Sequence, residues 1–175
     1  VKFRASIGTL GNQVTNGNFD YLGYLDNETL SYVMGGKVIS GLKAPTLAST
    51  NITWEKVTTT NFGLDIAMLN NRLNASFDYY IRNTNDMVIS KTYPAVLGSS
   101  GGKENLANMR TNGWELSVSL NDKINNVGGS PLMYSIGVGL ADSYSTITKF
   151  DNPEGALNNY YEGKRIGEIW GYVTD

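Results

Sequence analysis

NFGLDIAMLNNRLNASFDYYIR, residues 61–82, is the stretch that decides the fold. Apolar and polar side chains alternate along 61–68 and again along 73–82, and this period of two is that of a β-strand with one apolar face. Between the two runs stands Asn70-Asn71, a pair typical of tight hairpin turns because asparagine tolerates the backbone that such turns need. The stretch therefore predicts two long antiparallel strands joined by a short turn.

The two faces of this hairpin differ in chemistry, and three further segments repeat the pattern, at 2–7, 114–121 and 132–141. One face is continuously apolar, whereas the other mixes charge, hydroxyl, amide and glycine. On the apolar face we expect Phe62, Leu64, Ile66, Phe77, Leu116, Val118, Ile136 and Val138. On the opposite face we expect Asn61, Asp65, Asp78, Arg82 and Glu115.

The length of these segments and of their connections favours a membrane barrel over a soluble sheet. The longest runs, 73–82 and 132–141, fall within the about 9–11 residues that a tilted strand needs to cross a bilayer, whereas strands of soluble sheets average about 5–6. Short connections at Asn70-Asn71 and Asp122 to Pro131 alternate with long ones. The long connections run from Thr9 to about Val57, from Asn83 to about Arg110, and from Thr148 to Asp175.

Transmembrane barrels have this alternation, with short turns on the periplasmic side and long loops outside. We therefore expect the first, third and fifth segments to run outward and the other two to run inward. Tyr79 and Trp114 lie on the apolar face towards the loop ends of their strands. That placement suits the aromatic girdle at a membrane interface, although aromatic residues also favour strands in general.

Composition excludes several classes of function. The 175 residues include no cysteine and no histidine, so Cys/His metal sites, thiol nucleophiles and Ser-His-Asp triads are excluded. The net charge is −2 with both signs interleaved, so no basic surface for nucleic acid is expected. No apolar run reaches the ~18 residues of a membrane-spanning helix, and the chain shows no signal peptide. We expect no enzyme, no metal and no cofactor.

Two groups of side chains remain as candidates for chemistry or binding. Glu55, Asp65, Asp78 and Glu115 fall in the strands, but paired carboxylates hydrolyse glycosides only in a cleft, at about 5–9.5 Å, and the sequence shows no such cleft. Hence no catalytic residue is predicted. Aromatic side chains of the connections could stack on sugars or simply pack the loops, namely Tyr21, Tyr24, Tyr93, Tyr160 and Tyr161. Of these, Tyr93, Tyr160 and Tyr161 are the candidates for substrate contact.

Five elements along the chain also resemble one family, the SusC/RagA-type TonB-dependent outer-membrane transporters. In order they are KFRASIGTLGNQ (2–13), ITWEKVTTTNFGLD (52–65), LNNRL with DYY (69–73 and 78–80), NGWEL (112–116), and EGKRIG with WGY (162–167 and 170–172). Two departures stand out. Arg165 stands where the family element EG-x-PIG usually has proline, and Ala48-Ser49-Thr50-Asn51-Ile52 replaces the usual NP-x-L.

The resemblance implies a nutrient importer of the bacterial outer membrane. Such transporters are 22-stranded barrels plugged by an N-terminal domain, covered by a SusD-like surface lipoprotein, and powered through the TonB complex. They import oligosaccharides or, in some members, peptides. Residues 1–175 would be a partial barrel domain in contact with outer-membrane lipid, with about five long strands and long extracellular loops, and without signal, TonB box or plug.

The alternative is a soluble all-β glycan-binding module. In such a module the apolar face must be covered by a second layer of the same chain, whereas in a barrel segment it lies bare. Five strands are too few to close a transmembrane barrel, since the smallest use eight. We therefore expect that residues 1–175 alone do not form a functional unit and would aggregate or bind detergent.

Overall fold

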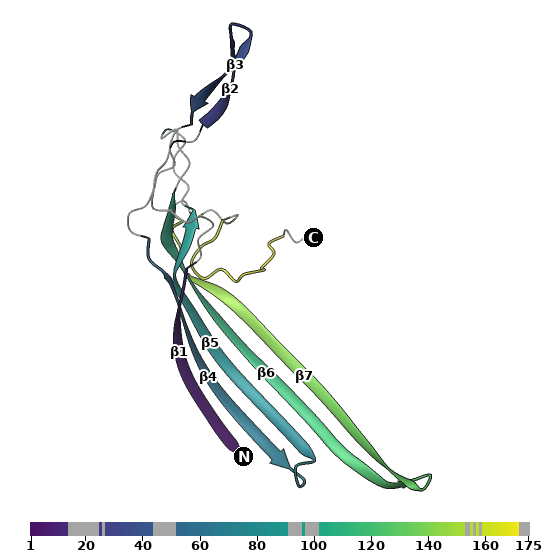
Figure 1. The fold of residues 1–175 in the computed structure, drawn as a ribbon. Helices are drawn as coiled ribbons and strands as arrows, with labels where there is room; N and C mark the ends of the chain where they lie inside the picture. Colours follow the sequence, from purple (N-terminus) through teal and green to yellow (C-terminus); the bar gives the residue numbers. More distant parts are fainter. Residues whose placement is uncertain are drawn as a thin grey trace, which may run out of the picture.

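Five long strands form one antiparallel sheet. The computed structural model describes residues 1–13, 25, 27–43, 52–90, 96, 102–152, 155, 157 and 159–171. Across the sheet the order is β1-β4-β5-β6-β7, and every neighbouring pair is antiparallel (Figure 1). The bounds are β1 Lys2–Asn12, β4 Glu55–Met68, β5 Leu73–Ser90, β6 Lys103–Val127 and β7 Ser130–Lys149. The expected all-β antiparallel fold is confirmed.

Two tight turns lie at one end of this sheet. The β4–β5 turn has positive φ at Leu69, Asn70 and Asn71, and Arg72 closes it by donating its N–H to the carbonyl of Leu69 at 3.2 Å. At the same end, Gly128 and Gly129 join β6 to β7, both with positive φ, where glycine has no steric penalty (Figure 1). At the opposite end, which we call the loop end, β5 ends at Ser90 and β6 begins at Lys103. Short and long connections therefore alternate as predicted.

The strands are longer than the sequence pattern predicted. The segment 73–82 is only the first part of β5, which continues to Ser90, and β6 begins at Lys103 rather than near Arg110. Likewise the connection expected from Asp122 to Pro131 is mostly strand. The reason is that alternation of apolar and polar residues marks only the part of a strand with one apolar face, and these strands continue beyond that part.

Polar side chains hold the loop end of the sheet together where the apolar pattern is lost. The buried carboxylate of Glu55 accepts hydrogen bonds from Asn12 Nδ2 at 3.1 Å and from the N–H of Val88 at 3.2 Å. These bonds connect β1, β4 and β5. The amide of Asn105 both accepts from the N–H and donates to the carbonyl of Thr53, at 2.8 and 2.9 Å. Side-chain amides thus replace apolar packing in this part of the sheet.

A second hairpin lies within the connection expected from Thr9 to Val57. It consists of β2 Asn27–Met34 and β3 Lys37–Leu42, paired with each other through a turn at Gly35-Gly36. Figure 1 shows it beyond the loop end, apart from the five-stranded sheet. The part of this connection that the structure describes is therefore largely β-hairpin and not irregular loop.

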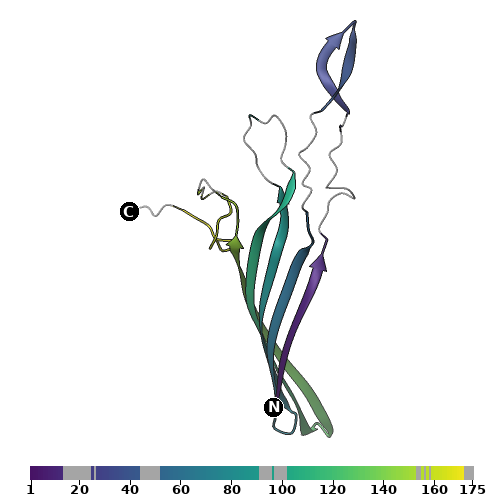
Figure 2. The ribbon, with the colours of Figure 1, turned by 90° about the vertical axis from the view of Figure 1, so that its left-hand side faces the viewer.

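The five-stranded sheet is a single curved layer (Figure 2). Within the described residues the only buried hydrophobic residues are Ala107 and Ile147, and no second layer covers either face. A soluble β-domain of this size would bury one face against another layer. The two faces of this sheet are therefore both available to other molecules or to other parts of a longer chain.

Candidate functional site: the two faces of the sheet

The polar face carries an ion-pair network centred on Arg4. Its guanidinium donates from Nε and Nη2 to the two carboxylate oxygens of Asp65, both at 2.9 Å, and from Nη2 to Asp78 Oδ2 at 2.8 Å. Such forked pairing is the favoured geometry of arginine with a carboxylate. Arg4 lies on β1, Asp65 on β4 and Asp78 on β5, so the network joins three strands.

Gly63 makes the reach of Arg4 across β4 possible. It is the register partner of both Arg4 and Asp78, and an added Cβ would lie 2.6 Å from Asp78 Oδ1 and 2.7 Å from Arg4 Cζ. Asp78 also stands directly opposite Glu115 on β6. Its Oδ1 atom is buried and has no hydrogen-bond partner within the described residues. Around Arg4, the polar face therefore carries three carboxylates, those of Asp65, Asp78 and Glu115, for one guanidinium.

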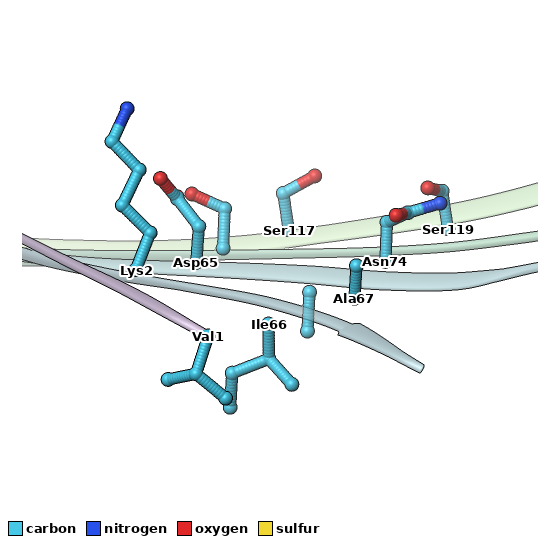
Figure 3. Close-up of a pocket in the computed structure, with 10 residues that line it drawn as sticks. Val1, Lys2, Asp65, Ile66, Ala67, Asn74, Ser117 and Ser119 are labelled. Atoms are coloured by element: carbon cyan, nitrogen blue, oxygen red, sulfur yellow. The ribbon is translucent and has the colours of Figure 1, made fainter. Parts of the chain in front are cut away.

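Two shallow hollows flank this network on the polar face. One, of about 370 Å³, lies beside Lys2 and Asp65 and is lined further by small side chains such as Ser117 and Ser119 (Figure 3). The other, of about 290 Å³, lies beside Asp78 and Glu115 and again borders Ser117. Of the four carboxylates considered above as possible acid–base groups, Asp65 and Asp78 are both held by Arg4. Small residues thus leave space next to fixed charges.

Gly113 provides a test of the packing on this face. A Cβ at Gly113 would overlap the ring of Tyr80, its partner across the β5–β6 pair, whereas a Cβ at Gly139 would meet nothing within 4 Å. We expect Gly113→Ala to make the complete protein about 1 kcal/mol less stable than Gly139→Ala, at the low end for overpacking because the ring can swing aside. The measurement is the urea midpoint of protein refolded into lipid vesicles.

A double variant serves as the control for this prediction. Adding Tyr80→Ala to the Gly113→Ala protein removes the ring that the new methyl group would displace. The two substitutions should therefore cost less together than the sum of their separate effects. Additive costs would show that contact with the Tyr80 ring is not the reason why an alanine at position 113 destabilises the protein.

The opposite face is an apolar band. Register partners place Leu64, Phe77, Leu116 and Leu140 side by side in one row across four strands, with Ile66, Ala75, Val118 and Val138 in the next row. Within the described residues no second layer covers these rows, and Phe77, Leu140 and Val138 are 40%, 56% and 58% exposed. The assignment of residues to the two faces is confirmed, since all eight predicted apolar residues share this face and all five predicted polar residues share the other.

Aromatic residues border the band towards the loop end. Tyr79 and Trp114 are direct cross-strand partners on the apolar face, as predicted, and Tyr144 on β7 lies one row further along. On β5 the apolar run from Leu73 to Ile81 is nine residues long, after which Asn83 and Asn85 follow on the same face. This length and border match a strand segment that crosses a bilayer.

Comparison with known proteins agrees with this arrangement. Residues 1–169 match the family model described as "TonB dependent receptor-like, beta-barrel". The chain belongs to this TonB-dependent receptor family. It is 30% identical over 118 residues to TonB-dependent receptor P3 of Formosa agariphila and 31% identical over 122 residues to TonB-dependent receptor SusC of Bacteroides thetaiotaomicron. These matches cover 67% and 68% of this chain and 12% of each relative.

A solved structure also shares the fold. The structure of the RagAB peptide importer in the "closed-closed" state superposes with a TM-score of 0.69 at 26% sequence identity, covering 86% of this chain and 16% of that chain. This chain therefore corresponds to a small part of each TonB-dependent receptor that it resembles. The resemblance to SusC/RagA-type transporters that the sequence motifs indicated is confirmed.

In this TonB-dependent receptor segment, residues 159–171 form a strap along β7 at the loop end. Gly163 and Ile147 are joined by a hydrogen bond from the glycine N–H to the isoleucine carbonyl at 2.8 Å, and Ile166 donates to the carbonyl of Ser145 at 2.9 Å. Thr146 and Arg165 form an isolated antiparallel bridge. The strap therefore occupies the last hydrogen-bonding groups on the outer edge of β7.

The strap contains two of the three tyrosines suggested as substrate contacts. The ring centroids of Tyr160 and Tyr161 lie 5.8 Å and 5.3 Å from the Nζ atom of Lys164. Tyr160 is 50% exposed and packs edge-on against Phe150. The Tyr161 hydroxyl instead donates to Glu168 Oε1 at 2.7 Å. Tyr93, like Tyr21 and Tyr24, lies outside the described residues.

Glu168 gives the strap a dependence on pH. Hydrogen bonds from the Tyr161 hydroxyl and the Trp170 indole hold the pKa of this carboxyl below its ordinary value of 4.5. A lowered pKa in the folded state means that the contribution to stability is present above the ordinary value and is lost as pH falls through the folded one. We expect the strap to stay attached at neutral pH and to detach only as pH falls below the ordinary pKa of a glutamate. Hydrogen exchange of the strap amides of Gly163 and Ile166, which donate to β7, would report detachment in the complete protein, and detachment near neutral pH would contradict the prediction.

Proposed function

We propose that this chain is part of the transmembrane barrel of a TonB-dependent transporter in a bacterial outer membrane. The observation that carries the proposal is the bare apolar band on one face of strands whose opposite face holds the Arg4 network. A charge on the lipid side of a barrel costs about 2–4 kcal/mol at mid-bilayer depth, so the face with Arg4, Asp65 and Asp78 would turn to the lumen. A soluble glycan-binding module would need a cover for the band, and the described residues provide none.

The rest of the barrel would come from other parts of a longer chain. Five strands are fewer than the eight of the smallest transmembrane barrels, and the chain spans 12% of each of the two curated relatives described above. We place the tight turns at Asn70-Asn71 and Gly128-Gly129 on the periplasmic side. The loop end, with hairpin β2–β3 and the strap, would then be extracellular. A plug domain inside the barrel would cover the polar face.

The cargo would be an oligosaccharide or a peptide, taken up together with a SusD-like surface lipoprotein and powered by the TonB complex. Support for this comes from the relatives, because one is SusC and the other is a structure described as a peptide importer. Tyr93, Tyr160 and Tyr161 are the candidate contacts, since aromatic rings stack on sugars and on peptide side chains alike. Tyr160 is the better placed of the described pair because it is half exposed and its hydroxyl has no hydrogen-bond partner in the part of the chain that the structure describes.

Growth of a deletion strain tests this function. Deleting the gene of the complete protein should abolish growth on one class of oligosaccharide or peptide as the limiting nutrient and leave growth on monosaccharides and amino acids unchanged. Complementation with the wild-type gene should restore it. Undiminished growth on every such nutrient, with the protein absent from the outer-membrane fraction of the wild type, would overturn the proposal.

A further inference from the structure

Two arginines stand in one row on the apolar face, at its loop end. Arg110 on β6 pairs with Thr146 on β7, and Thr146 is bridged to Arg165 of the strap. Directly paired residues of antiparallel strands point to the same face, so both arginines lie on the face of the apolar band. Their Cα atoms are two strand spacings apart, roughly 10 Å. They lie on the loop side of the aromatic residues Trp114 and Tyr144.

The guanidinium groups of these arginines are largely unused by the protein. Arg165 lies over the ring of Tyr144, 4.4 Å from its centroid, and donates no side-chain hydrogen bond within the described residues. Arg110 uses only Nε, which donates to Asn83 Oδ1 at 2.9 Å. Both residues are exposed. Since a guanidinium has five N–H donors, most of those in this pair are free to bind an anion.

Two charged residues of the strap, Glu168 and Lys164, do not compete for this pair. The carboxylate of Glu168 accepts hydrogen bonds from Tyr161, from Trp170 and from the backbone N–H of Arg165, and within the described residues it forms no ion pair with the Arg165 side chain. Lys164 is turned away, because its ammonium donates to the carbonyls of Leu157 and Asn159. Arg165 is the cation that this chain has where the family element usually has proline.

We propose that Arg110 and Arg165 bind the phosphate group of an anionic lipid headgroup in the outer leaflet. This inference rests on the proposed function, which turns the apolar band to lipid. Aromatic girdles mark the level of the headgroups, and the two arginines stand just beyond the aromatic residues. Arginine suits phosphate because its planar fork can bind two oxygens at once, and a partly desolvated site strengthens that attraction. Tyr144 holds Arg165 in place before the lipid arrives.

The experiment uses the complete protein in nanodiscs of phosphatidylcholine that contain a small fraction of phosphatidic acid as the probe. Native mass spectrometry counts the phosphatidic acid that stays with the protein. We expect retention to be roughly tenfold weaker in the double variant Arg110→Gln/Arg165→Gln, a factor that corresponds to about 1.4 kcal/mol. The matched control is Arg82→Gln, an exposed arginine at a similar height on the polar face, which should retain the probe like wild type.

Two further arms identify the ligand. Replacing phosphatidic acid by oleic acid, a carboxylate anion, should abolish the difference between wild type and double variant, and millimolar inorganic phosphate should not displace the bound lipid. Equal retention of phosphatidic acid by wild type and double variant would overturn the inference. So would an oleic acid result in which wild type and double variant differ as much as they do with phosphatidic acid. Displacement of the bound lipid by free phosphate would overturn it as well. If the protein enters no nanodisc of any composition, the proposed function fails instead.

Discussion

Replacing Leu116 by arginine in the complete protein is expected to remove most of the folded barrel from the membrane. Leu116 stands in the middle of the apolar band, with Phe77 and Leu140 as its direct partners on either side. A guanidinium at that depth would face hydrocarbon, at a cost of about 2–4 kcal/mol. Because proteins are stable by only about 5–15 kcal/mol, that cost is a large share of the total.

The matched variant is Ser117→Arg, one residue along the same strand. Ser117 points to the polar face and borders both hollows, near Asp65, Asp78 and Glu115, so an arginine there has space and acidic partners. We expect near-normal amounts of folded protein. Folded barrels migrate differently from unfolded chains on gels run without heating, and that fraction is the measurement. If the two variants behave alike, the assignment of the faces is wrong.

The parts of the fold that depend on local chemistry were predictable from the sequence. A period of two identifies strands wherever one face is apolar, and Asn70-Asn71 specifies a turn because asparagine accepts positive φ, which both residues have. The outer halves of β5 and β6 lacked that signal, since side-chain amides such as Asn105 hold them instead. The sequence pattern therefore predicts loops for these halves, whereas the structure has strands.

The search for long alternating segments does not predict hairpin β2–β3, although the sequence contains a signal for it. Gly35-Gly36 stands between two short runs of alternating residues, and this is the pattern of a two-residue hairpin turn. Its strands, of 8 and 6 residues, are shorter than those of the sheet. A criterion based on the length of a transmembrane strand does not identify them, because neither is long enough to cross a bilayer.

The Arg4 network and the Arg110–Arg165 pair could not be predicted from the sequence for a different reason. Arg4 and Asp65 are 61 residues apart, and their contact requires the register of β1 on β4. Shifting a strand by one residue moves every side chain to the other face, and alternation fixes the face but not which residues stand opposite. Likewise only the fold of the strap brings Arg165 beside Thr146. Sequence reasoning therefore found the faces but not the contacts on them.

Reversing the charge of Arg4 is expected to have the second large effect. In an Arg4→Glu protein a third carboxylate joins Asp65 and Asp78 where a guanidinium held both, and Glu115 stands beside them. Like charges at such distances repel, and the hydrogen bonds to both aspartates are lost. We expect much less folded barrel, by the same gel measurement, and a partial recovery at high salt because salt screens the repulsion.

Two further variants separate this network from a general need for positive charge. Arg82→Glu changes an arginine on the same face that forms no ion pair within the described residues and only lies 6.0 Å from the ring centroid of Tyr80, so a small effect is expected. The exchange Arg4→Asp with Asp65→Arg keeps one arginine and two carboxylates, and restores a forked pair between β1 and β4. It should fold better than Arg4→Glu alone. If Arg82→Glu is as harmful as Arg4→Glu, or if the exchange recovers nothing, the polar face needs cations in number only, and the specific geometry around Gly63 has no role in assembling the barrel.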